Sequence, residues 1–137
     1  MAFSIVHTDH SLQPWEQLPA NVGEYKAGQA LKVNNGKVEA VSPALTTVPP
    51  YICMGNKSVK AAGEMLPVIR VTEATMFEAP LTKLTAGAKP GAMLQVSAGG
   101  LGVDQTAPGS FEVVYAQGTA QDDMVRGRFV TVPGGGV

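Results

Sequence analysis

Apolar and polar residues alternate on both sides of an Asn-Gly pair within residues 26–41. Asn-Gly between two alternating runs is a strong hairpin signal, because both residues tolerate the positive φ angles of a two-residue turn. With Asn35-Gly36 as the turn, directly opposed residues share one face of the hairpin. The expected pairs are Asn34 with Lys37, Val33 with Val38, Lys32 with Glu39, and Leu31 with Ala40. The apolar pairs form one surface, and Lys32 pairs with Glu39 on the other.

A similar segment occurs 63 residues later (91 minus 28), without a gap. The identical positions are Lys26/Lys89, Gly28/Gly91, Leu31/Leu94, Val33/Val96 and Gly36/Gly99. With Ala98-Gly99 as its turn, the second hairpin is expected to place Val96 opposite Leu101. The same turn places Leu94 opposite Val103. The pattern indicates an internal duplication, and a chance likeness of two Gly/Val-rich hairpins is the alternative.

Other short apolar runs predict further strands, and no window shows a helical period. The runs are 51–54, 65–71, 76–78, 79–84, 111–116 and 124–130. Pairing Met65 with Met124 requires an offset of 59 (124 minus 65), so the repeat is gapped there. These runs predict an all-β fold, a small barrel or sandwich of short strands and hairpins. We expect an all-β domain over 24–132, with pseudo-repeats 24–84 and 85–132, and a flexible tail over 133–137.

Residues 1–23 are predicted to be an extended N-terminal arm. The segment contains Pro14 and Pro19, lacks a helical period and is too apolar for a free disordered tail. Its apolar residues are expected to bind a partner; they are Phe3, Ile5, Trp15 and Leu18. An edge strand folded back on the chain's own core is the alternative.

The composition is poor in charge. Charged residues make up 15% of the chain, against about 25% in a typical domain, so part of the surface is expected to be covered by another protein. The net charge of −1 argues against nucleic acid and anionic membranes, which require a clustered basic patch. A single cysteine, Cys53, allows no intramolecular disulfide. The N-terminal residues resemble no secretory leader, which predicts synthesis in the cytoplasm.

The chain offers little catalytic chemistry. His7-Thr8-Asp9-His10 is the one cluster with metal-ligating residue types, but on an arm it would lack a fixed geometry. Cys53 lies within an apolar run and is expected to be a buried small hydrophobe. Ser97-Ala98-Gly99 is only half of a nucleophile elbow, because Gln95 stands where the leading glycine would be. We therefore expect no enzymatic activity, no catalytic residues, no metal and no cofactor.

Four segments together resemble the head decoration (capsid cement) proteins of tailed bacteriophages. They are 26–33 (KAGQALKV), 36–40 (GKVEA), 51–55 (YICMG) and 61–68 (AAGEMLPV). The shared pattern is a small residue and glycine before a strand, a Gly-centred hairpin, an aliphatic strand ending in glycine, and Ala-Gly-Glu before the next strand. The resemblance covers residues 24–71 and reaches the second half only through the repeat.

The resemblance implies a structural virion protein, made in the host cytoplasm, that binds the outer surface of the capsid and stabilises contacts between capsomers. Its implied partners are the major capsid protein and further copies of itself, a trimer being favoured and a dimer possible. The alternative is a virion or tail-associated β module that binds a glycan or receptor. That alternative requires Tyr25, Tyr51 and Tyr115 to meet in space.

Overall fold

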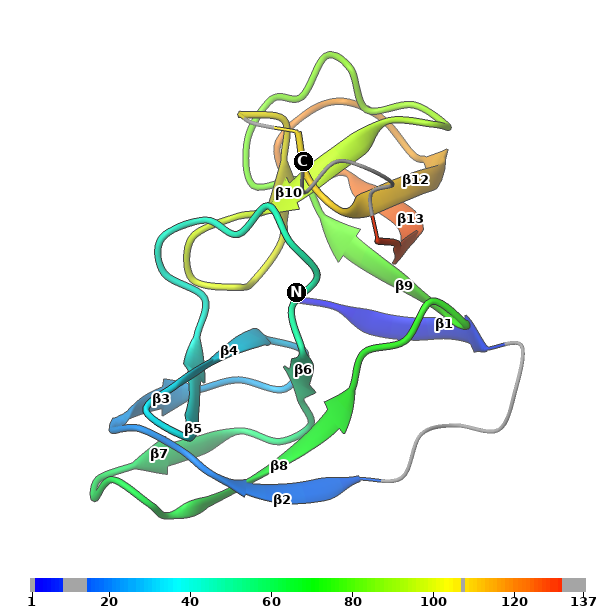
Figure 1. Ribbon diagram of the computed structural model, residues 1–137. Coiled ribbons are helices and arrows are strands. Elements are labelled where there is room, and N and C mark those ends of the chain that lie inside the picture. Colours follow the sequence, from blue (N-terminus) through cyan, green and yellow to red (C-terminus); the bar gives the residue numbers. More distant parts are fainter. Residues whose placement is uncertain (1, 9–14, 107, 132–137) are drawn as a thin grey trace.

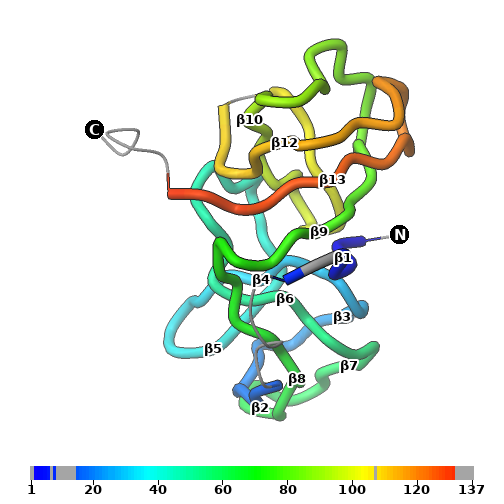
Figure 2. Tube along the Cα trace, turned by 90° about the vertical axis from the view of Figure 1, so that its right-hand side faces the viewer, coloured from blue at the N-terminus to red at the C-terminus, as the bar shows by residue number. Residues whose placement is uncertain are grey.

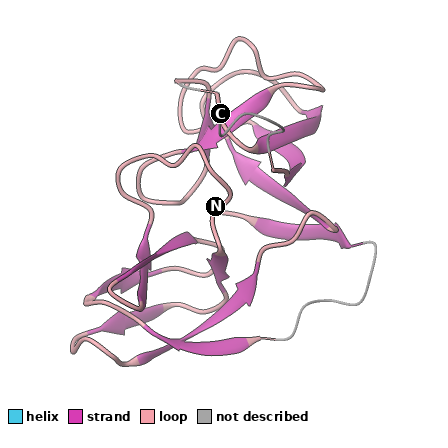
Figure 3. Cartoon of the chain, viewed as in Figure 1, coloured by secondary structure: helices cyan, strands magenta, loops and turns pink. Residues whose placement is uncertain are grey.

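The protein is all-β. The computed structural model describes residues 2–8, 15–106 and 108–131, and within them it has thirteen strands and no helix (Figures 1 and 3). The strands are β1 (Ser4–Thr8), β2 (Glu16–Pro19), β3 (Gly23–Tyr25), β4 (Ala30–Asn34), β5 (Lys37–Ala40), β6 (Tyr51–Cys53), β7 (Lys57–Val59), β8 (Met65–Arg70), β9 (Thr75–Pro80), β10 (Met93–Val96), β11 (Val103–Asp104), β12 (Phe111–Ala116) and β13 (Met124–Phe129).

These strands form three sheets in which every ladder is antiparallel. A six-stranded sheet has the order β1-β9-β13-β12-β10-β11, a five-stranded sheet the order β2-β8-β6-β4-β5, and β3 pairs with β7. The two larger sheets occupy opposite ends of the molecule, with β1 between them (Figures 1 and 2). In each large sheet one isolated parallel bridge joins two strands that are not neighbours in the sheet. Ala20, after β2, bridges to Val38 of β5, and Leu81, after β9, bridges to Val103 of β11. The described residues thus form open sheets, with no closed barrel.

The two large sheets have the same pairing scheme. In one, β8 lies between β2 and β6, and in the other, β13 lies between β9 and β12. The pairs Pro19 with Met65 and Pro80 with Met124 occupy equivalent places, at offsets of 61 (80 minus 19) and 59 (124 minus 65). Met65 and Met124, the residues that the sequence aligned at an offset of 59, thus hold corresponding places in the two sheets. The isolated bridges noted above are equivalent too, so strands far apart in sequence follow one plan.

The turn that precedes each hairpin is also the same in both sheets. The amide of Gln29 donates to the Lys26 carbonyl at 3.0 Å, and that of Ala92 donates to the Lys89 carbonyl at 2.9 Å. The third residue of each turn is a glycine with positive φ, 88° at Gly28 and 92° in the second copy. A side chain is disfavoured in this left-handed region, which explains why glycine occurs at both positions.

The first hairpin forms as expected. β4 and β5 pair in the predicted register, and the turn residues Asn35 and Gly36 have φ angles of 53° and 74°. Lys32 and Glu39 form an ion pair at 3.5 Å. The apolar face is only partly buried, because Val33 at the hairpin's tip is 53% exposed.

The second hairpin differs from the expected one. Val96 pairs with Val103, not with Leu101, and residues 97–102 form a loop wider than a two-residue turn. This loop contacts the other sheet, since the Ala30 amide donates to the Gly100 carbonyl at 2.7 Å. A Cβ atom at Gly100, whose φ is +75°, would clash with the Ala30 carbonyl oxygen. Packing between the two sheets therefore overrides the local turn preference.

The other predicted strands are largely present. Run 111–116 is β12 as predicted, and 51–54, 65–71 and 124–130 each contain a strand one residue shorter. The two expected runs 76–78 and 79–84 are instead one strand, β9, which ends at Pro80, so residues 81–84 lie outside it. Within the predicted arm, the described residues form β1, paired with β9, and β2, paired with β8. These are edge strands on the chain's own sheets, the second of the two alternatives for this segment.

Two hydrophobic clusters hold the molecule together. The larger combines residues of both sheets, including Ala30, Ile52 and Ile69 from one and Phe77 and Phe129 from the other. The smaller lies within the five-stranded sheet and its β3–β7 pair. Its buried members are Ala20, Tyr25, Leu31, Val38, Cys53, Val59, Leu66 and Val68. The larger cluster therefore joins the two sheets, whereas the smaller one belongs to the five-stranded sheet alone.

Candidate partner-binding surface

The four apolar residues of the N-terminal segment are in different environments. Phe3 is 4% exposed and packs edge-on or tilted against three other phenylalanines, with ring centroids 6.2 Å from Phe77, 5.9 Å from Phe111 and 5.5 Å from Phe129. Its amide also donates to the Gly28 carbonyl at 2.9 Å. In this conformation Phe3 is a core residue, and a partner cannot reach it.

Ile5 is half-buried on β1, opposite Phe77. It lines an apolar groove of about 430 Å³ between β1 and the five-stranded sheet. The groove's lining contains one ionisable side chain, Cys53. That thiol is buried, which raises its pKa and keeps it protonated, so the expectation of a buried small hydrophobe is confirmed.

Leu18 is in β2 of the five-stranded sheet, and Trp15 directly precedes that strand. Leu18 is half-buried, pairs with Leu66 and packs against the smaller cluster. Trp15 precedes β2 and is 61% exposed. Of the four predicted anchors, therefore, Trp15 presents most of its surface to solvent, and the structure does not bring the four side chains into one patch.

Large apolar side chains other than Trp15 are exposed as well, and the hydrophobic pattern does not mark them as exposed. In the described part of the chain they are Val6, Val22, Val33, Met65, Leu84, Val114 and Tyr115. Met65 lies opposite Pro19 at the far end of β2 from Trp15. Single exposed apolar residues are ordinary in proteins, but here they occur on a chain with few charges.

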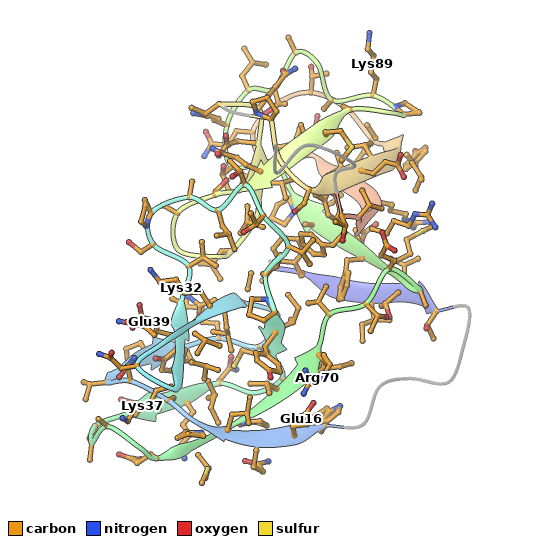
Figure 4. The ribbon with its side chains drawn as sticks, viewed as in Figure 1. Glu16, Lys32, Lys37, Glu39, Arg70 and Lys89 are labelled. Carbon is orange, nitrogen blue, oxygen red and sulfur yellow. The ribbon has the colours of Figure 1, made fainter. Side chains whose placement is uncertain are left out.

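The arginines neutralise glutamates across strands. Each of the three arginines, all within the described residues, pairs with a glutamate on a neighbouring strand: Arg70 with Glu16 at 3.3 Å, Arg126 with Glu78 at 3.0 Å, and Arg128 with Glu112 at 3.5 Å. Arg70 and Glu16 point toward one another, whereas Lys89 projects from the opposite end of the molecule (Figure 4). This arrangement makes no concentrated basic surface.

A buried polar network in the second hairpin was not anticipated. Asp104 is 4% exposed and accepts hydrogen bonds from Gln95 Nε2 at 2.8 Å, Ser97 Oγ at 2.7 Å and the Thr106 amide at 2.7 Å. Burial would raise the pKa of Asp104, but these three donors outweigh it and lower the pKa below its usual value. The carboxylate is thus ionised, and its hydrogen bonds hold the loop of the second hairpin in place.

The other candidates for chemistry form no active centre in the described residues. Ser97 is bonded to Asp104 and to the Thr82 hydroxyl, with no histidine among its described partners. Among the described residues, no three His, Cys, Asp or Glu side chains are grouped to hold a metal. Of the His7-to-His10 cluster, Asp9 and His10 lie outside the described residues. The described residues also contain no helix able to cross a membrane.

The three tyrosines required for glycan binding do not form a shared exposed platform. Tyr25 is 4% exposed, and its hydroxyl donates to the Asn21 carbonyl at 2.7 Å. Tyr51 lies under Arg70 at 5.2 Å, on the five-stranded sheet. Tyr115 lies under Arg126 at 5.9 Å, on the six-stranded sheet. Tyr51 and Tyr115 therefore lie on different sheets, each beside an arginine, and only Tyr115 is exposed.

Comparison with known proteins adds no family: no family model matches the sequence, and no curated protein matches it.

Proposed function

We propose that this chain is a structural virion protein that binds the outer surface of a tailed-bacteriophage capsid and stabilises the contacts between capsomers. The observation that carries the proposal is the exposure of Trp15, 61%, beside an edge strand of a charge-poor β fold. A large aromatic ring in water is costly and is the residue type most enriched at the centres of protein interfaces. The sequence resemblance to decoration proteins supplies the identity of the partner, the major capsid protein.

The repeated pairing scheme supports this role. The two large sheets are interpreted as copies of one ancestral unit, made by internal duplication and joined by a shared core. A chain with two similar units can contact two similar neighbours, which suits a position where capsomers meet. We further propose that the chain forms a homo-oligomer, with the trimer favoured over the dimer. Its location is the outer capsid surface, after synthesis in the host cytoplasm.

The chemistry of the described residues supports binding over catalysis. The buried side chains of Asp104 and Ser97 use their hydrogen bonds on each other and on neighbouring groups of their own chain. Cys53 is buried and protonated. We propose that the protein has no enzymatic activity and needs no cofactor. No observation favours glycan binding, because Tyr25 is buried.

The direct test is retention on undecorated heads assembled from the accompanying major capsid protein. Purified chain is mixed with heads and sedimented, and the bound fraction is measured against concentration. Truncating the N-terminal segment is unsuitable, because β1 and β2 belong to the fold. Trp15→Ser is the informative variant, and Leu84→Ser, at a position 71% exposed on the other unit, is the matched control.

We expect saturable binding of the native chain, about tenfold or more weaker binding of Trp15→Ser, and little change for Leu84→Ser. Absence of any retention of the native chain would refute the proposed function. Loss of binding in Leu84→Ser but not in Trp15→Ser would place the binding surface on the other sheet. Measuring the mass of the free chain in solution tests the trimer.

A further inference from the structure

The equivalence of the two sheets reveals an edge that is occupied in one and open in the other. β2 and β9 are equivalent strands, related by the offset of 61 (80 minus 19). β9 pairs on one side with β13 and on the other with β1. β2 pairs with β8, the equivalent of β13, but no described strand takes the place of β1. At its C-terminal end β2 bridges to β5 as β9 bridges to β11, so the difference is confined to the N-terminal part of β2.

The backbone of β2 is oriented to accept a strand at that place. Gln17 lies opposite Pro67, and the Pro67 carbonyl accepts the Met54 amide at 2.9 Å on the far side of β8. Because both polar groups of a strand residue point to the same side, Pro67 faces β6, and Gln17 belongs to a non-hydrogen-bonded pair. The N–H and C=O of Gln17 therefore point away from β8, toward the open edge. The equivalent residue in the other sheet, Glu78, lies opposite Ser4 of β1.

The side chains around this edge indicate which residue types an added strand would need. Gln17 and Trp15 are exposed and lie on the same face of the strand, since they are two residues apart. Glu16 lies on the other face and is paired with Arg70 at 3.3 Å. In the occupied edge the equivalent of Glu16 is the buried Phe77, which faces Ile5 of β1. An incoming strand at β2 would thus place a polar residue near Glu16 and an apolar residue beside the Trp15 ring.

We infer that the edge of β2 at residues 15–17 binds an extended segment of the major capsid protein, which adds antiparallel to the five-stranded sheet as β1 adds to the six-stranded one. This inference rests on the proposed function. Strand addition draws affinity from backbone hydrogen bonds and specificity from alternate side chains. The segment is one of alternating apolar and polar residues, without proline where it faces Gln17.

A second copy of this chain is a poorer occupant of the same edge. Two β2 strands paired antiparallel about Gln17 would set Trp15 of each copy opposite Pro19 of the other. Proline has no amide N–H to donate, so each end of that short ladder would lose a hydrogen bond. A foreign strand with an amide at that position avoids the loss.

Gln17→Pro tests the inference at one backbone atom. Proline is tolerated on an edge strand where the missing N–H faces outward, so the fold is expected to survive while the edge loses its donor. Gln17→Thr is the matched control, because it changes the side chain and keeps the N–H. Urea midpoints of both variants establish that they are folded, and retention on undecorated heads measures binding.

We expect Gln17→Pro to bind about tenfold or more weakly and Gln17→Thr to bind like the native chain. Hydrogen exchange of the native chain supplies a second readout that needs no variant: the outward-facing amides of Trp15 and Gln17 exchange fast in the free protein and at least about tenfold more slowly on heads, whereas the Glu16 amide faces β8 and is the internal control. Equal binding of the two variants, or unchanged exchange of the Trp15 and Gln17 amides on heads, would overturn the inference and leave the proposed function standing. Slow exchange of these two amides already in the free protein would also overturn it, since the edge would then be covered without the capsid.

Discussion

Replacing Phe3 with alanine tests whether the N-terminal segment is part of the fold. The Phe3 ring is 4% exposed and contacts three phenylalanine rings in the cluster shared by both sheets. Phe→Ala changes at such sites cost about 3–5 kcal/mol through lost burial and the cavity that remains. At about 2.1 cal/mol/K per residue over 137 residues, this corresponds to a fall in Tm of about 10–17 °C.

Urea unfolding followed by tryptophan fluorescence and far-UV circular dichroism measures the change. Val6→Ala is the control, because Val6 lies on the same strand but is 39% exposed; its expected cost is below about 1 kcal/mol. If Phe3→Ala lowered the unfolding free energy by less than about 1 kcal/mol, the segment would be a loosely attached arm and not a strand of the core. Its apolar residues would then be available to a partner, as the sequence first indicated.

Three further predictions concern the interior and surface of the two sheets. Asp104→Ala should lower the unfolding free energy by about 2–4 kcal/mol in urea melts, because Gln95 and the Thr106 amide lose a charged acceptor; a cost below 1 kcal/mol would show that the network is dispensable. Since the pKa of Asp104 is lowered by folding, its contribution is full above about pH 4 and is lost as the pH falls through the folded-state pKa. The native chain and Asp104→Ala should therefore converge in stability on acidification, and a constant difference down to pH 2 would contradict this sign. Gly100→Ala should cost about 2–5 kcal/mol in thermal melts because of its positive φ and the clash with the Ala30 carbonyl, and unchanged melting would mean that the loop does not pack there. Lys32→Ala should cost less than about 1 kcal/mol, because its ion pair with Glu39 is partly solvated; a larger loss would show a role beyond that pair.

Local signals in the sequence predicted the local features of the fold. Asn35-Gly36 defined both the turn and the register of its hairpin, since two adjacent residues able to take positive φ leave few alternatives. The strand at 111–116 was recognised from its continuous apolar and aromatic run. Gly28 and its counterpart marked the repeated turn before each hairpin.

The features that were not predicted depend on contacts between distant segments. The second hairpin widens because Gly100 must approach Ala30, 70 residues away (100 minus 30), and no local pattern encodes that distance. The sequence of residues 1–23 predicts an arm and not two edge strands, because an edge strand receives its partner from elsewhere in the chain. Long-range pairing of this kind leaves only a weak trace in the amino-acid sequence.

The exposure of the four expected partner-binding residues follows only in part from the sequence. Trp15 is exposed, whereas Phe3, which is also aromatic and lies in the same N-terminal segment, is buried. The Asp104 network has a signal in the sequence: Gln95 of β10 and Ser97, just after it, are polar and two residues apart in an otherwise apolar run, and Asp104 pairs with Gln95. Polar side chains on a buried strand predict a buried hydrogen-bond partner nearby, because buried polar groups are rarely left without one.

The most direct test of the account is a reconstruction by electron cryo-microscopy of heads incubated with the native chain. The account predicts extra density on the outer surface above the junctions between capsomers, into which both large sheets fit, with Trp15 and the edge of β2 against the capsid protein. Heads that carry no extra density at saturating concentrations of chain would contradict it.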